Sequence, residues 1–107
     1  MEMMYYIRDE KNIPIGAVVL AVHENGKVSR GVSMCSTVDK FSKDRAKKIA
    51  FSRLKAALGK KMNIRPCVPY NGIDEKKHSR VCPFDYYGFF EDEPTKFEYR
   101  MMHKPID

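Results

Sequence analysis

The dipeptide Asn25-Gly26 is the feature that most limits what this chain can fold into. Asn-Gly accepts positive φ angles at both central positions of a type I′ turn, and such a turn closes a tight antiparallel hairpin. Residues 13–23 before it are rich in Val and Ile, and residues 28–35 after it alternate bulkier with small side chains. Both patterns are typical of strands. The turn therefore predicts two strands paired in a defined register.

A third strand is expected before this hairpin. Residues 3–8 form a short run with two tyrosines, and the polar residues 9–12 separate this run from the next strand. Three strand-like segments joined by short turns indicate an antiparallel meander. We therefore predict that residues 1–41 form a three-stranded meander.

Residues 42–61 carry the pattern of an amphipathic helix. Ser42 is placed to cap the helix N-terminus, Phe41 precedes it as one half of a hydrophobic staple, and Gly59 is placed to end the helix. Apolar residues recur at spacings of three and four, which puts them on one face. These residues are Ala46, Ile49, Ala50, Leu54, Ala57 and Leu58. We predict that this face packs on the sheet.

The rest of the chain divides into a loop and a second hairpin. Residues 62–82 lose periodicity and contain two prolines and an Asn-Gly pair, which predicts an irregular loop. Phe84–Phe90 and Lys96–Met102 are expected to pair as a β-hairpin across residues 91–95, so that residues 83–107 form an aromatic hairpin and tail. The expected fold is α+β, with an antiparallel meander sheet, one helix packed on it and a C-terminal hairpin. The 107 residues fit a single domain, 1–107.

Charge is concentrated in the middle of the chain. The net charge is +6, yet residues 42–82 hold twelve basic and three acidic side chains, whereas the segments on either side are neutral or acidic. A basic block of this kind attracts phosphates or an acidic protein surface. Lysine and arginine also keep an exposed helix face solvated without any ligand, and that alternative stays open.

The predicted binding surface combines this helix with the loop after it. We expect the helix face opposite the apolar one, together with loop cations, to form one anion-attracting surface. Its residues are Arg45, Lys48, Lys55, Arg65, Lys76, Lys77 and Arg80. An aromatic alternative for stacking on bases is Tyr86, Tyr87 and Phe90, although such a run is also typical of a core strand.

Motifs for catalysis or cofactors are weak. Cys67, His78 and Cys82 are the residue types that bind zinc, but they lack the close cysteine pair that usually forms such a site. Cys35 with one of His23, His78 or His103 is a conceivable nucleophile and base, with structural cysteines as the alternative. No Gly-rich phosphate-binding motif occurs. We therefore expect no catalytic site, no metal and no cofactor.

Location follows from similar reasoning. The N-terminus has neither the basic nor the apolar region of a secretory signal, and the three cysteines are odd in number and not closely paired. No apolar run reaches the roughly 18 residues of a membrane span. These features predict a cytosolic protein that does not cross a membrane.

Two resemblances arise around the helix. The stretch CSTVDKFSKDRAKKIAFSR, residues 35–53, together with the opening residues Tyr5, Tyr6, Arg8 and Asp9, resembles small tailed-phage (prophage) proteins. It departs from their pattern at Thr37 and Ala46, where that pattern has Pro and Gly. Separately, Ser42-Lys43 with Ala46-Lys47 after three strands is similar to the last helix of a double-stranded-RNA-binding domain, whose lysines contact phosphates.

The phage resemblance implies a function class. Small phage proteins often inhibit a bacterial defence component, such as a CRISPR effector, or capture a nucleotide signal, and these tasks need a binding surface. The expected partner is accordingly a host or defence protein, a nucleoprotein or a nucleotide, met in the host bacterial cytosol. The alternatives are a nucleic-acid-binding accessory protein of phage replication or packaging and, less favoured, a small enzyme.

Overall fold

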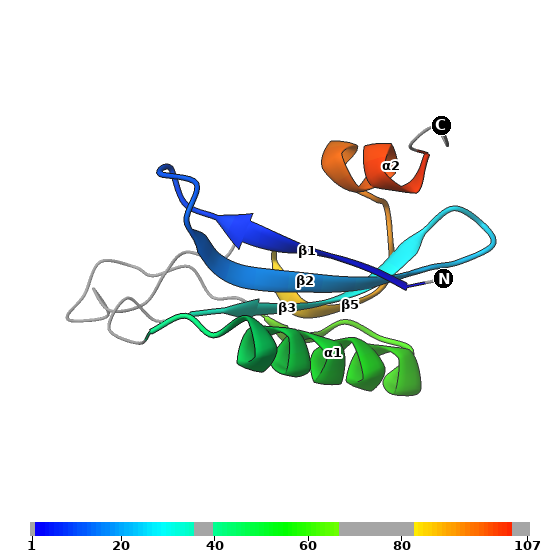
Figure 1. Ribbon diagram of the computed structural model, residues 1–107. Coiled ribbons are helices and arrows are strands. Elements are labelled where there is room, and N and C mark those ends of the chain that lie inside the picture. Colours follow the sequence, from blue (N-terminus) through cyan, green and yellow to red (C-terminus); the bar gives the residue numbers. More distant parts are fainter. Residues whose placement is uncertain (1, 36–39, 67–82, 104–107) are drawn as a thin grey trace.

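The chain folds around one five-stranded antiparallel sheet (Figure 1). The computed structural model describes residues 2–35, 40–66 and 83–103. The strand order across the sheet is β1-β2-β3-β5-β4. The strands are β1 (Glu2–Arg8), β2 (Pro14–Val22), β3 (Val28–Met34), β4 (Ile64–Pro66) and β5 (Tyr86–Asp92).

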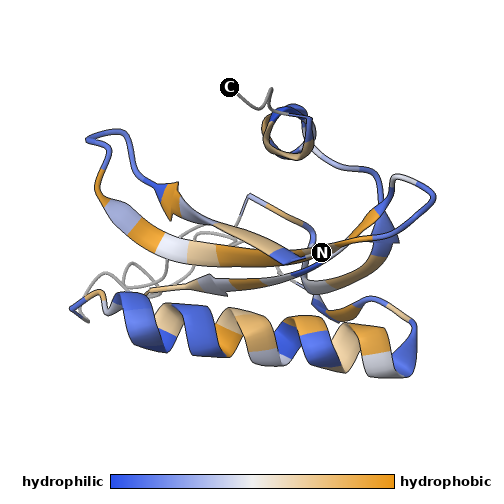
Figure 2. Cartoon of the chain, turned by 45° about the vertical axis from the view of Figure 1, so that its right-hand side comes forward, coloured by the Kyte–Doolittle hydropathy of each residue, from blue (hydrophilic) through white to orange (hydrophobic). Residues whose placement is uncertain are grey.

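Helices cover both faces of the sheet. The long helix α1 (Lys43–Lys60) lies along one face, and the short helix α2 (Lys96–Met102) lies over one end of the other face (Figure 1). Strand β2, next to the edge strand β1, has the sequence PIGAVVLAV and is coloured mainly as hydrophobic (Figure 2). Ala17 and Val19 face α1, whereas Val18 and Leu20 face the opposite side. Because both faces of this strand are buried, its sequence is a continuous run of apolar residues without polar alternation.

Two glycines let α1 lie close to the sheet. Gly31 of β3 is paired with Gly88 of β5 directly under the helix. A Cβ atom at Gly31 would meet the backbone of Ala50 and Leu54, and one at Gly88 would meet the side chain of Ile64 and the backbone of α1. The facing positions of α1 are small as well, since Ala46, Ala50 and Ala57 are buried. Helix and sheet therefore approach more closely here than larger side chains would permit.

The fold class predicted from the sequence is confirmed. Residues 2–34 form the three-stranded meander, with Asn25-Gly26 between β2 and β3. The type I′ turn predicted there is wrong, because Gly26 has a positive φ of 86° but Asn25 does not, and the Gly26 N–H donates to the His23 carbonyl. Ser42 caps α1, and its hydroxyl accepts a hydrogen bond from the Arg45 backbone N–H. The helix ends differently from the prediction, because Lys61 takes the left-handed position with φ 54° and Gly59 lies inside the helix. Ile49 is also 39% exposed at the edge of the packed face.

The prediction that Phe84–Phe90 pairs with a strand at Lys96–Met102 is wrong. The strand predicted at Phe84–Phe90 exists as β5, but it pairs with β3 and with β4, which lies inside the segment expected to be an irregular loop. Lys96–Met102 forms α2 instead of a strand. Thr95 and Glu98 make a reciprocal capping box, in which each side chain accepts a hydrogen bond from the other residue's backbone N–H. This box satisfies backbone donors of the first helical turn and favours a helix.

Within the residues that the structure describes, no helix is long and apolar enough to cross a lipid bilayer.

Candidate polyanion-binding surface

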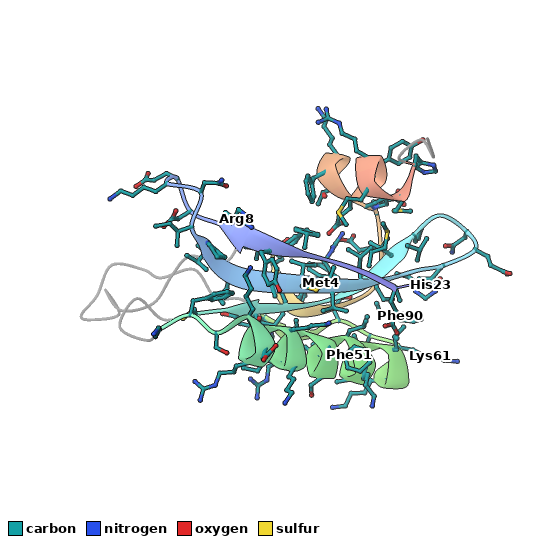
Figure 3. All side chains as sticks on the ribbon, viewed as in Figure 1. Met4, Arg8, His23, Phe51, Lys61 and Phe90 are labelled. Atoms are coloured by element: carbon teal, nitrogen blue, oxygen red, sulfur yellow. The ribbon has the colours of Figure 1, made fainter. Side chains whose placement is uncertain are left out.

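The cations predicted on the helix lie on its outward face. Arg45, Lys48 and Lys55 are all exposed, whereas Ala50 and Leu54 on the opposite side are buried against the sheet. With a rise of about 1.5 Å per residue, Lys48 and Lys55 stand roughly 10 Å apart along the helix axis. Side chains of α1 project away from the sheet into solvent (Figure 3). Helix packing therefore holds these charges on one rigid support.

Further exposed cations lie elsewhere on the helix and at its C-cap, with Lys43 over the Tyr6 ring of β1 and Lys47 in a cavity lined also by Met4. Lys43, Lys47, Lys60 and Lys61 are exposed as well. We call the exposed cations of this helix and its C-cap the α1 surface: Lys43, Arg45, Lys47, Lys48, Lys55, Lys60 and Lys61. Only one acidic residue, Asp44, lies in the same helix. The alternating hydrophilic bands along α1 reflect this composition (Figure 2).

Within the described residues, the cations of the α1 surface form no ion pairs. Among the described residues, the salt bridges join Lys27 to Glu93 and Arg30 to Asp92 and Glu98, and none involves a cation of the α1 surface. Two of its lysines lie over aromatic rings, Lys43 over Tyr6 and Lys55 over Phe51. A ring contact leaves the ammonium charge in place. Within the described part of the chain, these cations therefore keep their positive charge.

Of the predicted loop cations, Arg65 is the one that lies within the described residues. Arg65 is exposed in β4, at the sheet edge next to β5, so it comes from the sheet and not from the helix. Its backbone has φ 54°, a conformation that costs energy for a side chain with a Cβ atom. Lys76, Lys77 and Arg80 lie outside the described residues. The zinc candidates Cys67, His78 and Cys82 also lie outside them.

The three aromatic residues predicted as an alternative site pack against other side chains of the fold. Tyr86 packs edge-on against Phe89, with ring centroids 5.5 Å apart. Tyr87 lies under the Arg53 guanidinium at 4.5 Å, and Phe90 packs edge-on against His23 at 6.0 Å. All three predicted aromatic residues are only partly exposed. Strand β5 uses these rings mainly to pack within the fold.

The described cysteine and histidines do not come together. Cys35 follows the end of β3, whereas His23 precedes its start, so the length of a seven-residue strand separates them. At about 3.3 Å per residue this is roughly 20 Å. His103 and Asn25 both line an open cavity that lies at the His23 end of the strand. His23 instead hydrogen-bonds the buried Ser29 hydroxyl at 2.7 Å. His78 lies outside the described residues.

Sequence reasoning missed a buried charge cluster between the sheet and α2. Arg30 is 1% exposed and Glu98 is 0% exposed. The Arg30 guanidinium donates to both Glu98 carboxylate oxygens, at 3.0 and 2.6 Å, and to Asp92 at 2.7 Å. The Tyr5 hydroxyl donates to Glu98 at 2.7 Å. The signal for this cluster was a lone arginine among the valines of β3.

Electrostatics in this cluster favour the charged arginine and the neutral tyrosine. Burial opposes the charge of Arg30, but hydrogen bonds to Glu98 and Asp92 and their negative charges outweigh it and raise the pKa of Arg30. Burial, followed by the hydrogen bond to Glu98, raises the pKa of Tyr5 well above its ordinary value. Perturbed groups of this kind also occur at active sites. Here the guanidinium is enclosed between Phe84 and Phe89, so the cluster serves to attach α2 to the sheet.

One open cavity of about 440 Å³ lies between the β2–β3 turn and α2. Its lining mixes the cations Lys27, Lys96 and Arg100 with Glu93. Since Lys27 and Glu93 approach within 3.9 Å, part of this charge is neutralised locally. The cavity therefore has less net attraction for an anion than the α1 surface.

Comparison of the chain with protein-family models, with curated proteins and with solved structures found no match.

Proposed function

We propose that this is a non-enzymatic binding protein that holds a phosphate-rich ligand on the α1 surface. The observation that carries the proposal is the row of exposed cations on one helix without ion-pair partners among the described residues. Neutralising phosphates with such cations releases counterions, and this release supplies the favourable free energy of binding. The ligand class is therefore a nucleic-acid backbone, free or within a nucleoprotein.

The cations are held in fixed positions by the helix, and this favours a ligand with regularly spaced phosphates over small mobile anions. Arg45, Lys48 and Lys55 project from a helix that is held against the sheet over about two turns by Ala46, Ala50 and Leu54. Because the spacing of these cations is fixed, several of them can contact successive phosphates at once. Phosphate contacts of this kind set the position and orientation of a protein on a duplex. The contacts carry no sequence information, so binding to nucleic acid is expected to be independent of base sequence.

The resemblance to small tailed-phage proteins suggests where such binding acts. In that setting the ligand is the nucleic acid of a defence complex, such as a CRISPR effector, or the phage's own genome during replication or packaging. The protein would then act in the host bacterial cytosol by binding the phosphate backbone of that nucleic acid. This biological role rests on the resemblance alone.

A second candidate is a partner with an acidic protein surface. Ile49 is 39% exposed and Phe51 38% exposed, and both lie among the cations of α1. Apolar side chains contribute to protein–protein contacts but gain little from a phosphate backbone. Binding through these residues would be less sensitive to salt than binding through phosphates.

Charge reversal with a matched control tests the proposal. Arg45, Lys48 and Lys55 are changed together to Glu, and binding of a fluorescent RNA or DNA duplex is followed by anisotropy. The control changes Lys11, Lys27 and Lys96 to Glu, which alters net charge equally on exposed residues away from α1. We expect the α1 variant to lose at least about a hundredfold in affinity, since removed phosphate contacts are replaced by repulsion.

The control variant is expected to lose far less, because its cations lie outside the proposed surface. Equal losses in both variants would mean that only net charge matters and would refute a defined surface. Circular dichroism of both variants checks that the fold is kept.

A further inference from the structure

The two edges of the sheet are protected very differently. Strand β4 has three residues, and it carries Arg65 in a left-handed conformation and Pro66, which has no backbone N–H to donate. These features discourage pairing with another strand. Strand β1 at the other edge has seven residues and contains neither proline nor glycine. In the described part of the chain its backbone pairs only with β2, so one side of β1 is open.

The sequence of β1 is complementary to itself in antiparallel orientation. The strand reads EMMYYIR, with an acidic residue at one end, a basic residue at the other and five uncharged residues between them. When Tyr5 lies opposite Tyr5 of a second copy, Glu2 of each copy lies opposite Arg8 of the other. The same register places Met3 opposite Ile7. Opposite charges and apolar pairs directly across two strands are favourable.

Neighbouring registers lose this match. Centring the pairing on Met4 places Glu2 opposite Tyr6 and leaves Arg8 without a partner in the strand. Centring it on Tyr6 places Arg8 opposite Met4. Only the Tyr5-centred register pairs both charges and uses the whole strand.

Apolar side chains flank this edge on both faces of the sheet. On the α1 face, Met4 and Phe51 line a cavity of about 360 Å³ together with Glu2 and Lys47. Met4 lies on β1 above Phe51 of the helix, and Arg8 marks the far end of the strand (Figure 3). On the α2 face, Phe97 is 53% exposed and packs edge-on against Tyr5 at 4.8 Å. A strand added beside β1 would cover side chains on both faces.

We infer that a second copy of this chain pairs along β1, with Tyr5 on the two-fold axis. The two five-stranded sheets then join into one continuous antiparallel sheet. A two-fold axis perpendicular to the sheet keeps the two α1 helices on the same side. The inference is independent of ligand binding, but it places two α1 surfaces side by side.

A charge-swap experiment tests this interface. Sedimentation equilibrium of the full chain over micromolar concentrations is expected to give a dimer. Glu2→Arg alone and Arg8→Glu alone each create two like-charge pairs across the interface, and each is expected to weaken dimerisation at least about tenfold. The Glu2→Arg/Arg8→Glu double variant restores both pairs and the wild-type association.

Mixing the two single variants provides the sharpest outcome. One then carries two basic ends and the other two acidic ends, so an equimolar mixture is expected to form heterodimers while each variant alone stays largely monomeric. Met4→Lys adds a charge in the middle of the edge and is expected to abolish the dimer even if the end pairs contribute little.

Three results would overturn the inference. These are a monomeric wild type at the highest concentration reached, a dimer that none of the edge variants weakens, and a mixture that associates no better than its components. Pairing of β1 with an unrelated extended peptide in a monomeric wild type would likewise replace the second copy as the occupant.

Discussion

Replacing Arg30 with methionine tests how α2 is held on the sheet. The Glu98 carboxylate accepts hydrogen bonds from the Arg30 guanidinium, the Tyr5 hydroxyl and the Thr95 backbone N–H, and it is 0% exposed. Arg30→Met leaves this carboxylate buried without its cation. Removing one partner of a buried ion pair costs about 3–5 kcal/mol. Small domains are stable by only about 5–15 kcal/mol, so the loss is a large fraction of the total.

Urea unfolding followed by circular dichroism measures this loss directly. A shift of about 3–5 kcal/mol corresponds to a melting temperature lower by roughly 12 °C or more in a domain of this size. Lys27→Met is the matched control, since Lys27 forms an exposed ion pair with Glu93 at 3.9 Å. Exposed pairs contribute about 0–1 kcal/mol. The control should therefore unfold almost like the wild type.

A double variant distinguishes the cost of the unpaired buried Glu98 charge from the cost of the packing lost with Arg30. Arg30→Met/Glu98→Gln removes the buried charge and keeps an amide oxygen that accepts from the Thr95 backbone N–H and an amide N–H that can donate to the Tyr5 hydroxyl. We expect it to recover about 1–3 kcal/mol relative to Arg30→Met alone. A loss below about 1 kcal/mol in Arg30→Met would refute the view that this ion pair anchors α2.

Further predictions concern the glycines and the titration of Tyr5. Gly31→Ala should destabilise the protein by at least about 1–3 kcal/mol in urea unfolding, because its Cβ would meet the backbone of α1. Gly59→Ala should stabilise it by about 0.5–1 kcal/mol, since the position is helical and open, and a loss there would contradict the assigned helix. The raised pKa of Tyr5 favours its protonated form, so its contribution is intact below the unfolded value of about 10 and is lost as pH rises towards the folded value. The unfolding free energy of the wild type should therefore fall more steeply above about pH 10 than that of Tyr5→Phe, and parallel curves would refute this.

Elements with local signals could be predicted from the sequence. The hairpin between β2 and β3 was predicted from Asn25-Gly26, although only Gly26 of this pair takes the positive φ that a type I′ turn requires of both residues. Helix α1 was predicted from apolar spacing and from the Ser42 cap, both of which act within a few residues. The exposed positions of Arg45 and Lys48 follow from the same periodicity.

Elements that depend on distant partners were assigned wrongly or missed. Residues 96–102 alternate aromatic and polar side chains, which favoured a strand, yet the capping box and the contact of Glu98 with Arg30 favour a helix. These two residues are 68 positions apart, beyond the reach of any local pattern. Likewise, the pairing of β4 with β5 places Arg65 in an edge strand, inside a segment predicted to be an irregular loop.

The salt dependence of duplex binding tests the proposed function most directly. The measurement compares the slope of log K against log salt concentration for the wild type and for Arg45/Lys48/Lys55→Gln, using anisotropy of a labelled duplex. Each phosphate contact contributes about 0.9 to the magnitude of the slope for B-form DNA. If all three cations contact phosphates, the variant slope should be smaller by about 2–3. Equal slopes, or wild-type binding that does not change with salt, would contradict phosphate binding by the α1 surface.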